Sequence, residues 1–440
     1  MHVAIVGGGV TGLSVADELS SRGHQVTVYE ADEMLGGLAG SFHVGGTYLE
    51  KFYHHLFTSD TAMAALIERL GLGDKLEWLP TSNSYYVDRI YRLSTPMDLM
   101  RFSHISLLDR LRLGMLYLRT TFVQDWRPLE AVTAREWLVQ MAGERVYDAV
   151  WRPLLRTKFG RYADDVAAVW IWNKLKLRGS SRGSKQEERL GYLREGFGQA
   201  IEAWERLLRD RGVTFILGTA VQRINPLAQG LEVRTAEGEQ GFDAVVVTTA
   251  PSILARLTPD LPADYRVRLE RIAYLGNVCL VMQLDRSLSD TYWLNIGDPA
   301  IPFTGVIEHT NMQRPETYGG AHLAYISRYL DVEDPAYGYS AEDLLSEYLP
   351  HLKRMFSGFQ REWVQRLWAW RAAYAQPVIG THYSDLRPPF RTPLPGLWLS
   401  SMAQVYPEDR GMNYAVVYGQ KVVKEMLGDD PSSDDSSPAG

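Results

Sequence analysis

The chain has 440 residues, of which 45% are hydrophobic, so it is long enough to bury the cores of more than one domain. Its net charge of -7 gives no sign of a nucleic-acid partner, and one cysteine, Cys279, excludes a disulfide framework and every cysteine-rich metal site. The sequence shows neither a secretion signal nor an apolar run of membrane-spanning length, so we expect a cytoplasmic protein.

The first thirty residues predict a β–α–β unit that binds a dinucleotide. An apolar run, "HVAIV", leads into three glycines in G-x-G-x-x-G spacing, a helical pattern follows, and a second run, "QVTVY", ends at an acid. In such a unit the glycines bring backbone close to a pyrophosphate, the helix N-terminus binds phosphate, and the acid binds ribose hydroxyls. The expected contacts are Gly7, Gly9, Val10, Thr11, Gly12 and Glu30.

A second glycine pair, Gly36-Gly37, follows Glu30 in "ADEMLGGLAGSF". This extended signature resembles the flavoprotein family of amine oxidases and protoporphyrinogen oxidases. The resemblance implies non-covalently bound FAD, with the backbone of Gly36, Gly37 and Leu38 beside the inner phosphate and the ribityl chain. The family usually has arginine where this chain has Leu38.

Later segments extend the resemblance. They are "YLREGFGQAIEAW" (192–204), "VTFILGTAVQRI" (213–224), "FDAVVVTTAP" (242–251) and "GLWLSSMAQVYPEDRGMNYAVVYGQKVV" (396–423). The resemblance implies that Val221 contacts adenine through its backbone. It also implies that Gly411, Met412 and Asn413, at the start of the last helix, present N–H groups to the pyrimidine edge of the flavin. Ser400 and Ser401 depart from the family, which usually ends the preceding strand in Gly-Asp or Gly-Glu.

The order of these motifs implies an α/β fold of amine-oxidase/GDI-like architecture, with a Rossmann-type FAD-binding domain and an inserted α+β substrate domain. The predicted FAD-binding domain is discontinuous. We expect it at 1–85, 190–255 and 390–428, with a helical insertion at 86–189, the substrate domain at 256–389 and a disordered tail at 429–440.

Two adjacent histidines in "EKFYHHLF", His54 and His55, follow the second glycine pair. The family resemblance implies that this segment crosses near the reactive side of the flavin. Adjacent residues of an extended segment point to opposite faces, which disfavours a shared metal, and we predict no metal site. Two interpretations stay open, namely acid–base or hydrogen-bonding contact with the substrate, and packing.

Between residues 151 and 189, ten basic residues stand against four acidic ones, with three tryptophans among them. Such a segment can attract an anionic substrate or lipid headgroups, and a solvated basic face is the alternative. Part of it, "LLRTKFGRYADD", resembles an element of UDP-galactopyranose mutases, which makes Lys158 a third candidate catalytic residue. Upstream, "SLLDRLRLGMLYLRTTF" (106–122) is either a core helix or a helix lying in a membrane interface.

Three hypotheses of function follow. The first is an FAD-dependent oxidoreductase that takes hydride from a hydrophobic or anionic organic substrate. The second is a non-redox flavoenzyme acting on a nucleotide sugar, because "HHLFT" partly matches a segment of UDP-galactopyranose mutases. The third is a flavin-free carrier resembling the GDP-dissociation inhibitors. We expect a small-molecule substrate, either anionic or lipid-linked, and peripheral membrane contact; the sequence leaves the oligomeric state open.

Overall fold

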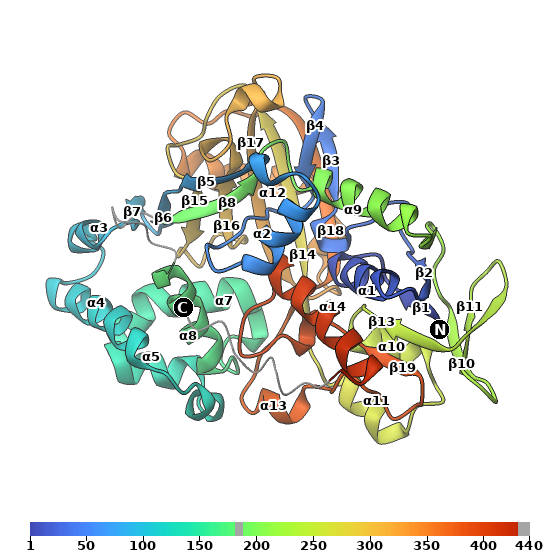
Figure 1. The fold of residues 1–440 in the computed structure, drawn as a ribbon. Coiled ribbons are helices and arrows are strands. Elements are labelled where there is room, and N and C mark those ends of the chain that lie inside the picture. The colour runs from blue at the N-terminus through green and yellow to red at the C-terminus, as the bar shows by residue number, and fades with distance from the viewer. Residues whose placement is uncertain (181–187, 430–440) are drawn as a thin grey trace.

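A computed structural model describes residues 1–180 and 188–429 of the chain. The predicted disordered tail, apart from Asp429, and part of the basic segment at 181–187 lie outside the described residues. Two large sheets organise the molecule, one of five strands and one of seven, and a group of helices lies beside the seven-stranded sheet (Figure 1). This mixed architecture with a parallel sheet confirms the predicted fold class.

The five-stranded sheet is parallel and draws its strands from distant parts of the chain. Its order is β19 (Leu397–Leu399), β13 (Ala244–Val247), β1 (His2–Val6), β2 (Gln25–Tyr29) and β9 (Thr214–Ile216). Alternate residues of β1 face opposite layers, as the twofold period of a strand requires. Val3 and Ile5 pack towards α1 (Val10–Ser21), α9 (Gly198–Asp210) and α14 (Met412–Leu427).

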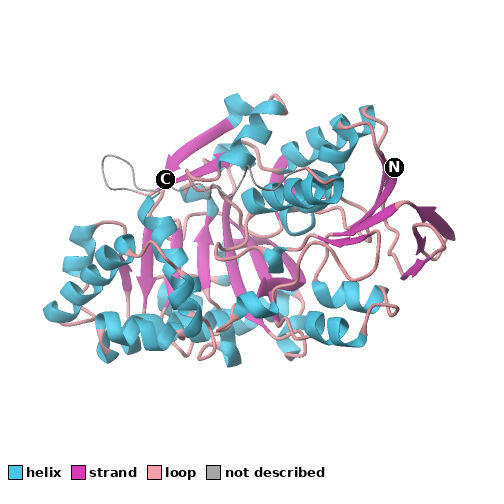
Figure 2. Cartoon of the chain, turned by 60° about the horizontal axis from the view of Figure 1, so that its bottom comes forward, coloured by secondary structure: helices cyan, strands magenta, loops and turns pink. Residues whose placement is uncertain are grey.

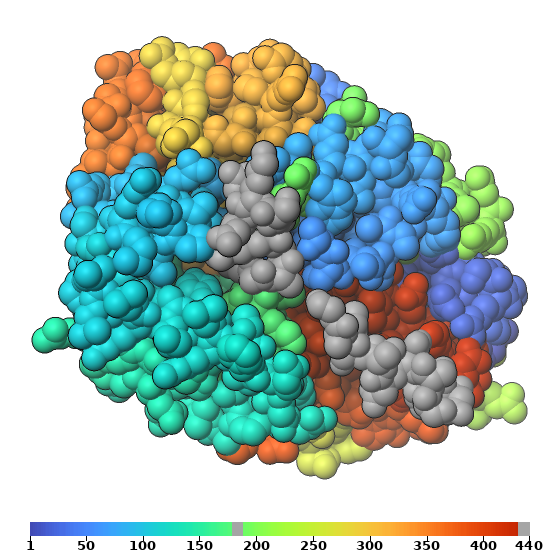
Figure 3. All heavy atoms as spheres, turned by 60° about the vertical axis from the view of Figure 1, so that its left-hand side comes forward, coloured from blue at the N-terminus to red at the C-terminus, as the bar shows by residue number. Residues whose placement is uncertain are grey.

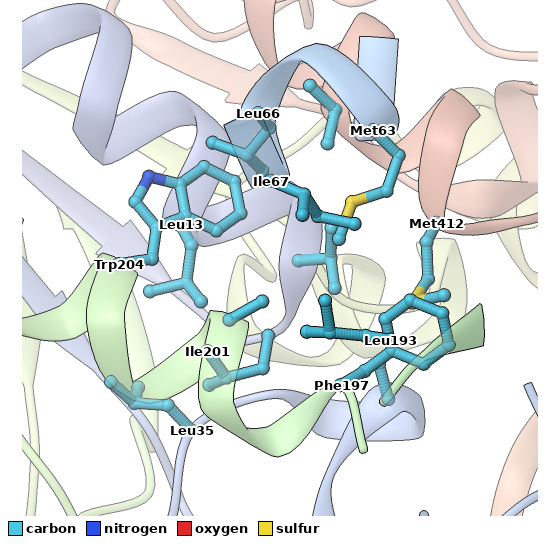
Figure 4. Packing of buried hydrophobic residues seen from close by; sticks show 14 of the residues in the cluster. Leu13, Leu35, Met63, Leu66, Ile67, Leu193, Phe197, Ile201, Trp204 and Met412 are labelled. Atoms are coloured by element: carbon cyan, nitrogen blue, oxygen red, sulfur yellow. The ribbon is translucent and has the colours of Figure 1, made fainter. Parts of the chain in front are cut away.

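The other face of this sheet is covered by a three-stranded meander and two helices. They are β10 (Arg223–Pro226), β11 (Leu231–Arg234), β12 (Glu239–Phe242), α10 (Pro251–Leu257) and α11 (Ala263–Glu270). On the first face, side chains from α1, α2 (Thr61–Arg69), α9 and α14 pack together (Figure 4). Leu13, Met63, Trp204 and Met412 come from these four helices.

The seven-stranded sheet is antiparallel except for one pair. Its order is β18 (Val364–Pro377), β14 (Tyr274–Leu284), β17 (His322–Leu330), β16 (Gly305–Glu308), β15 (Trp293–Ile296), β6 (Asn83–Tyr86) and β7 (Ile90–Arg92). Helix α12 (Ala341–Met355) covers the face that carries Val278 and Leu280. Cys279 and Val281 point to the opposite face, into the core shared with the five-stranded sheet. Two ribbons, β3 (Ser41–Val44) with β4 (Thr47–Glu50) and β5 (Leu76–Pro80) with β8 (Arg189–Leu193), connect the layers.

The segment from 96 to 180 is helical and has its own hydrophobic core. Its helices are α3 (Pro96–Arg101), α4 (Leu107–Phe122), α5 (Ala134–Ala142), α6 (Glu144–Val146), α7 (Arg152–Phe159) and α8 (Ala168–Ser180). They group beside the strands of the larger sheet (Figure 2). The short helix α13 (Tyr383–Leu386) contributes Tyr383 to the same core. Among the described residues, no helix is both long and apolar enough to cross a bilayer.

Two strands that the sequence did not indicate, β6 and β7, lie at the start of the helical insertion predicted at 86–189. β6 begins at Asn83, inside the predicted first segment of the FAD-binding domain, yet it pairs with β15 of the larger sheet. The chain therefore passes into the larger sheet before it enters the helices. The predicted division into 1–85, 190–255 and 390–428, with insertions between, stays a proposal.

Candidate active site

The turn after β1 has the geometry that the first glycine motif predicts. Gly7 adopts a φ of 112°, in the region that favours glycine, and a Cβ added to Gly12 would lie 1.9 Å from the Gly7 carbonyl oxygen. Glycine at these two positions lets α1 begin directly against the strand end. Val10 and Thr11 occupy the first turn of this helix.

Gly9 differs from its neighbours, because protein packing does not require glycine there. Its φ is -73°, and an added Cβ would meet only Gly37 Cα and the Gly36 oxygen, at 3.9 and 4.0 Å. Gly36, with φ of 111°, donates its N–H to the Gly8 oxygen at 2.9 Å, so the two glycine motifs lie against each other. This arrangement leaves room for a ligand to approach the backbone at Gly9. Leu38, half-buried, follows in a short 3-10 turn.

Glu30 is held in place by backbone donors. Its Oε2 accepts the Gly8 N–H at 2.6 Å, and its Oε1 accepts the Asp32 N–H at 2.9 Å. Each carboxylate oxygen keeps a second lone pair, so the group can still accept ribose hydroxyls. The segment that carries Val221 crosses the end of β2, where the Thr219 N–H donates to the backbone carbonyl oxygen of Glu30 at 2.9 Å. The structure thus brings Val221 and Glu30 to one edge of the sheet, with Val221 half-buried.

Helix α14 packs against α1, the helix that follows this turn. Gly411 is its N-cap, with extended backbone and no neighbour within 4 Å of an added Cβ. Met412 and Asn413 are buried in the first turn, and the Asn413 Oδ1 accepts the Met63 N–H of α2 at 3.1 Å. The helix N-terminus therefore presents donors and a positive dipole end next to open space.

Two buried polar atoms support the fit of a dinucleotide cofactor. Thr249 follows β13 and contacts the position of a Gly7 Cβ, and its Oγ1 has no hydrogen-bond partner. The Arg410 Nε, directly before Gly411, is also buried without a partner. These two atoms have no hydrogen-bond partner in the protein, and no side chain lies close to the backbone at Gly9 or Gly411. Both features fit an extended ligand that carries phosphates. These residues would hold FAD.

The two predicted histidines contact different surroundings. The His54 Nδ1 donates to the Phe52 oxygen at 2.6 Å, and Arg410 lies close enough for its charge to act on the ring. Burial, with a smaller effect from Arg410, lowers the pKa of His54 to about 4. His55 packs against Trp293 with ring centroids 5.8 Å apart and lies 3.5 Å from the Tyr292 hydroxyl. Of the pair, His54 is the residue beside the start of α14.

Lys158, from α7, joins this site from the helical segment. Its Nζ lies 4.8 Å from the ring centroid of Tyr329 and 5.2 Å from that of Trp170. The Arg410 Nη2 donates to the Tyr329 hydroxyl at 3.1 Å. The structure therefore brings His54 and Lys158 into one cluster with two residues that sequence reasoning missed, Tyr329 and Arg410.

Burial and charge shift the pKa values within this cluster. Burial lowers the pKa of Lys158 to about 8, and the charges of Lys174 and Arg410 act in the same direction. Burial by itself would raise the pKa of the Tyr329 hydroxyl, but Lys158 and Arg410 together outweigh it and lower that pKa. The cluster thus holds groups that can exchange a proton near neutral pH.

Asp409 is the anionic member of the cluster. It forms an ion pair with Lys174 of α8, and its Oδ1 accepts the Trp170 Nε1–H at 3.4 Å. Burial opposes its charge, but the cations Lys174, Arg410 and Lys158 outweigh burial and hold the pKa of this carboxyl far below its usual range. Three cationic side chains therefore lie around Asp409, and one of them, Lys174, also interacts with the Asp60 carboxyl.

Sequence signals for the missed residues were weak. Arg410 immediately precedes the Gly411 motif, which could have marked it, whereas Tyr329 lies in an ordinary strand pattern. A cavity of about 960 Å³ is lined by Asn413, Tyr414, Val417 and Lys421 of α14 among others, and no residue of the two N-terminal glycine motifs lines it. Within residues 1–180 and 188–429, no group of three or more potential metal ligands lies together.

The chain matches known proteins along its length. A model of the family described as flavin containing amine oxidoreductase matches residues 10–427. The flavin-containing monoamine oxidase AofH of Mycobacterium tuberculosis is 24% identical over 285 residues, 60% of this chain and 61% of that protein. Mitochondrial protoporphyrinogen oxidase of Nicotiana tabacum is 30% identical over 116 residues, 26% of this chain and 23% of that protein. The matched part thus spans less than two thirds of either relative.

Solved structures show the same fold. A protein of Exiguobacterium sp. 255-15 described as a protoporphyrinogen oxidase has a TM-score of 0.78 at 18% identity, covering 98% of this chain and 99% of that one. Reduced UDP-galactopyranose mutase has a TM-score of 0.76 at 16% identity, covering 98% and 96%. The family match confirms the resemblance inferred from the glycine motifs and implies FAD as the cofactor. The chain belongs to the family of flavin-containing amine oxidoreductases.

Proposed function

We propose that this protein is an FAD-dependent oxidoreductase whose substrate combines a hydrophobic body with an anionic group. Bound FAD supplies the acceptor of a hydride from the substrate. The two glycine motifs and the N-terminus of α14 hold the cofactor, while the side chains next to Gly411 hold and orient the substrate. His54, Lys158, Tyr329 and Arg410 are these side chains.

The observation that carries the proposal is the concentration of positive charge at this site. Lys158, Lys174 and Arg410, all half-buried, lie around the Asp409 carboxylate, and Lys174 also interacts with the Asp60 carboxyl. Uncompensated buried charge is costly, so such a cluster favours a bound anion. A carboxylate or phosphate of the substrate would supply the missing negative charge at Lys158 and Arg410.

We also propose that Tyr329 handles the proton of the reaction. Oxidation of a C–N or C–C single bond to a double bond removes a hydride from a C–H bond and a proton from the neighbouring atom, and the cations beside Tyr329 stabilise its ionised hydroxyl. Tyr329 would take up that proton as the hydride leaves. His54, with its pKa lowered to about 4, stays neutral at physiological pH and acts as a hydrogen-bonding group.

Two compounds named in relatives and structural neighbours test the charge preference. Protoporphyrinogen carries two carboxylates, and putrescine carries two ammonium groups. Mixed anaerobically with the enzyme, protoporphyrinogen should bleach the flavin absorbance faster than putrescine, because the cluster repels a dication. Faster bleaching by putrescine would contradict the proposed substrate class.

Lys158 gives a prediction for pH. The charged form prevails below about pH 8, so affinity for an anionic substrate is present there and is lost as the pH rises through about 8. Lys158→Arg keeps its charge and should remove this loss, and Lys158→Met should raise the Kd about ten-fold below pH 8. The Kd comes from the concentration dependence of flavin bleaching. The control is Lys176→Met, which removes an exposed lysine 5.0 Å from the Trp172 ring.

The sugar-mutase hypothesis stays as a second candidate, because buried cations would also suit the diphosphate of a nucleotide sugar. Enzyme reduced with dithionite and given UDP-galactopyranose distinguishes the two. Isomerisation without net oxidation would favour the mutase, whereas consumption of an electron acceptor by an organic substrate favours the oxidoreductase. A flavin-free carrier is disfavoured by the intact glycine motifs and Glu30.

We also propose that the substrate is lipid-linked, that the protein is cytoplasmic and that it makes peripheral contact with a membrane. Two relatives are named zeta-carotene desaturase, one of them 39% identical over 77 residues, and carotenes are hydrocarbons that partition into membranes. A hydrophobic substrate of this kind would be met at a bilayer surface. Activity on vesicle-bound substrate that exceeds activity on detergent-dispersed substrate would support this part, and the reverse order would count against it.

A further inference from the structure

Helix α4 exposes an apolar stripe to solvent. Its large apolar side chains are between 47% and 80% exposed at six positions. These are Leu107, Leu108, Leu111, Met115, Leu118 and Phe122, called here the α4 stripe. Surface apolar residues are normally scattered singly, so a contiguous row on one helix indicates a binding face.

The spacing of these residues places them on one side of the helix. At about 100° per residue, the six positions fall within a sector of about 100°. Leu113, Leu116 and Thr120 lie on the opposite side and are buried against the helical core. Helix α4 therefore has two apolar sides, one buried against the helical core and one exposed to solvent.

Basic side chains border the α4 stripe. Arg112 and Arg119 are exposed and fall next to Leu108 on the helix circumference, and Arg112 also forms an ion pair with Asp109 at 3.1 Å. At the other edge, α3 packs near Gly114, where Leu99 would contact an added Cβ at 3.6 Å. The same short helix α3 exposes Met97, Met100 and Arg101, which extends the apolar face and its basic border.

The position of the stripe suits an external partner. α3 and α4 lie at the outer edge of the molecule, on the side away from the five-stranded sheet (Figure 1), and residues of this part of the chain face the viewer when that side is turned forward (Figure 3). The residues outside the described part, 181–187 and 430–440, contain no large apolar side chain that could cover the stripe. Its partner therefore comes from outside residues 1–440.

We propose that the α4 stripe docks the protein on a membrane that contains anionic lipid, with α4 lying in the plane of the interface. An exposed apolar sector bordered by arginines is the pattern of interfacial helices, which bury the sector among acyl chains and bind headgroup phosphates through the basic edge. A two-fold contact that packs two copies of α4 antiparallel would instead bring the arginine borders of both stripes together. This charge pattern favours lipid over a second copy.

Co-sedimentation with vesicles tests the proposal on the full FAD-loaded chain. Wild-type protein should bind phosphatidylcholine–phosphatidylglycerol vesicles more strongly than pure phosphatidylcholine vesicles, because Arg112 and Arg119 attract the anionic headgroups. Leu118→Glu should weaken binding to the mixed vesicles at least about ten-fold, since it removes a leucine that membrane binding would bury and adds a charge. The matched control is Val267→Glu on α11, equally apolar and 55% exposed, which should bind as the wild type does.

A probe on the stripe gives a second measurement that does not depend on the charged variant. Cys279 is fully buried, so an environment-sensitive thiol dye would label Leu118→Cys selectively. Its emission should shift to the blue with mixed vesicles, and a dye at Val267→Cys should not shift. Equal binding by wild type and Leu118→Glu, no preference for anionic vesicles, or light scattering that shows a dimer dissociated by Leu118→Glu without vesicle binding would overturn the proposal.

Discussion

Glu50 is a buried acid at the junction between the two large sheets. It is 1% exposed, and its carboxylate accepts the Phe197 N–H at 2.6 Å and the Tyr192 O–H at 2.7 Å. Burial raises the pKa of Glu50 to about 7, although both hydrogen bonds oppose the shift. Folding therefore favours the protonated form of this acid.

The sign of the resulting pH dependence is testable. Below about pH 4.5 the acid is protonated in both states, and between there and pH 7 only the folded state retains the proton, so stability falls as the pH rises. The loss amounts to about 3 kcal/mol. Between pH 5 and 7, the free energy of unfolding of the wild type relative to that of Glu50→Gln, both measured by urea unfolding, should fall by most of this amount. Glu239→Gln, an exposed control, should behave as the wild type.

The wild type and Glu50→Gln must be compared because the lowered pKa of His309 changes stability with pH in the opposite direction. Burial lowers the pKa of this histidine to about 3, so its contribution rises with pH through the same range. Equal pH dependence in wild type and Glu50→Gln would show that Glu50 does not hold its proton in the folded state.

Single residues also mark the limit of sequence reasoning at the site. Gly7, Gly12, Gly36 and Glu30 are local signals, since their conformations and contacts arise within one β–α–β unit and its continuation. The Tyr329–Arg410 hydrogen bond joins residues that are distant in the chain, and no spacing rule brings them together. Charge composition suggested an anionic partner near Lys158, but the cluster itself required the fold.

At the scale of helices, the α1–α14 crossing holds the cofactor-binding layer together. The Ser14 Oγ donates to the Val416 oxygen at 2.7 Å. A Cβ at Gly419 would lie 2.5 Å from Ser14 Cβ and 2.9 Å from the Thr11 oxygen. The two helices thus touch at a position where only glycine fits.

Gly419→Ala should therefore destabilise the protein. The added methyl group would push α14 away from α1, at a cost of about 1–3 kcal/mol, and FAD should dissociate more readily because both helices begin at its site. Thermal unfolding and FAD retention after gel filtration measure the two effects. Gly338→Ala, where an added Cβ meets nothing within 4 Å, is the control. Full stability of Gly419→Ala would contradict the tight crossing.

Helices and strands with a clear apolar pattern in their own sequence were predicted better than strands that form by pairing with a distant part of the chain. Strands β1 and β2 and helix α1 follow the apolar periodicity that predicted the first β–α–β unit. β6 was missed because "NSYY" has little strand pattern, and it is completed by pairing with β15 across the inserted helices. Such pairing depends on the whole chain.

At the scale of the whole molecule, the chain brings separate segments to one edge of the five-stranded sheet. The turn after β1, the end of β2 and the Gly36-Gly37 pair meet there, and α14 packs against α1. The larger sheet and the helical segment contribute Tyr329 and Lys158 beside it. The order of motifs predicted this meeting, because parallel strands end at a common edge where ligands bind.

Gly9→Val tests the central claim, that FAD occupies this edge, most directly. Packing of the protein itself leaves space at this position, so the variant should fold with the circular dichroism of the wild type. Its larger side chain would fill the approach to the pyrophosphate, so the FAD content per chain, measured by absorbance after denaturation, should fall from about one to near zero. A folded variant that retains stoichiometric FAD would contradict the account.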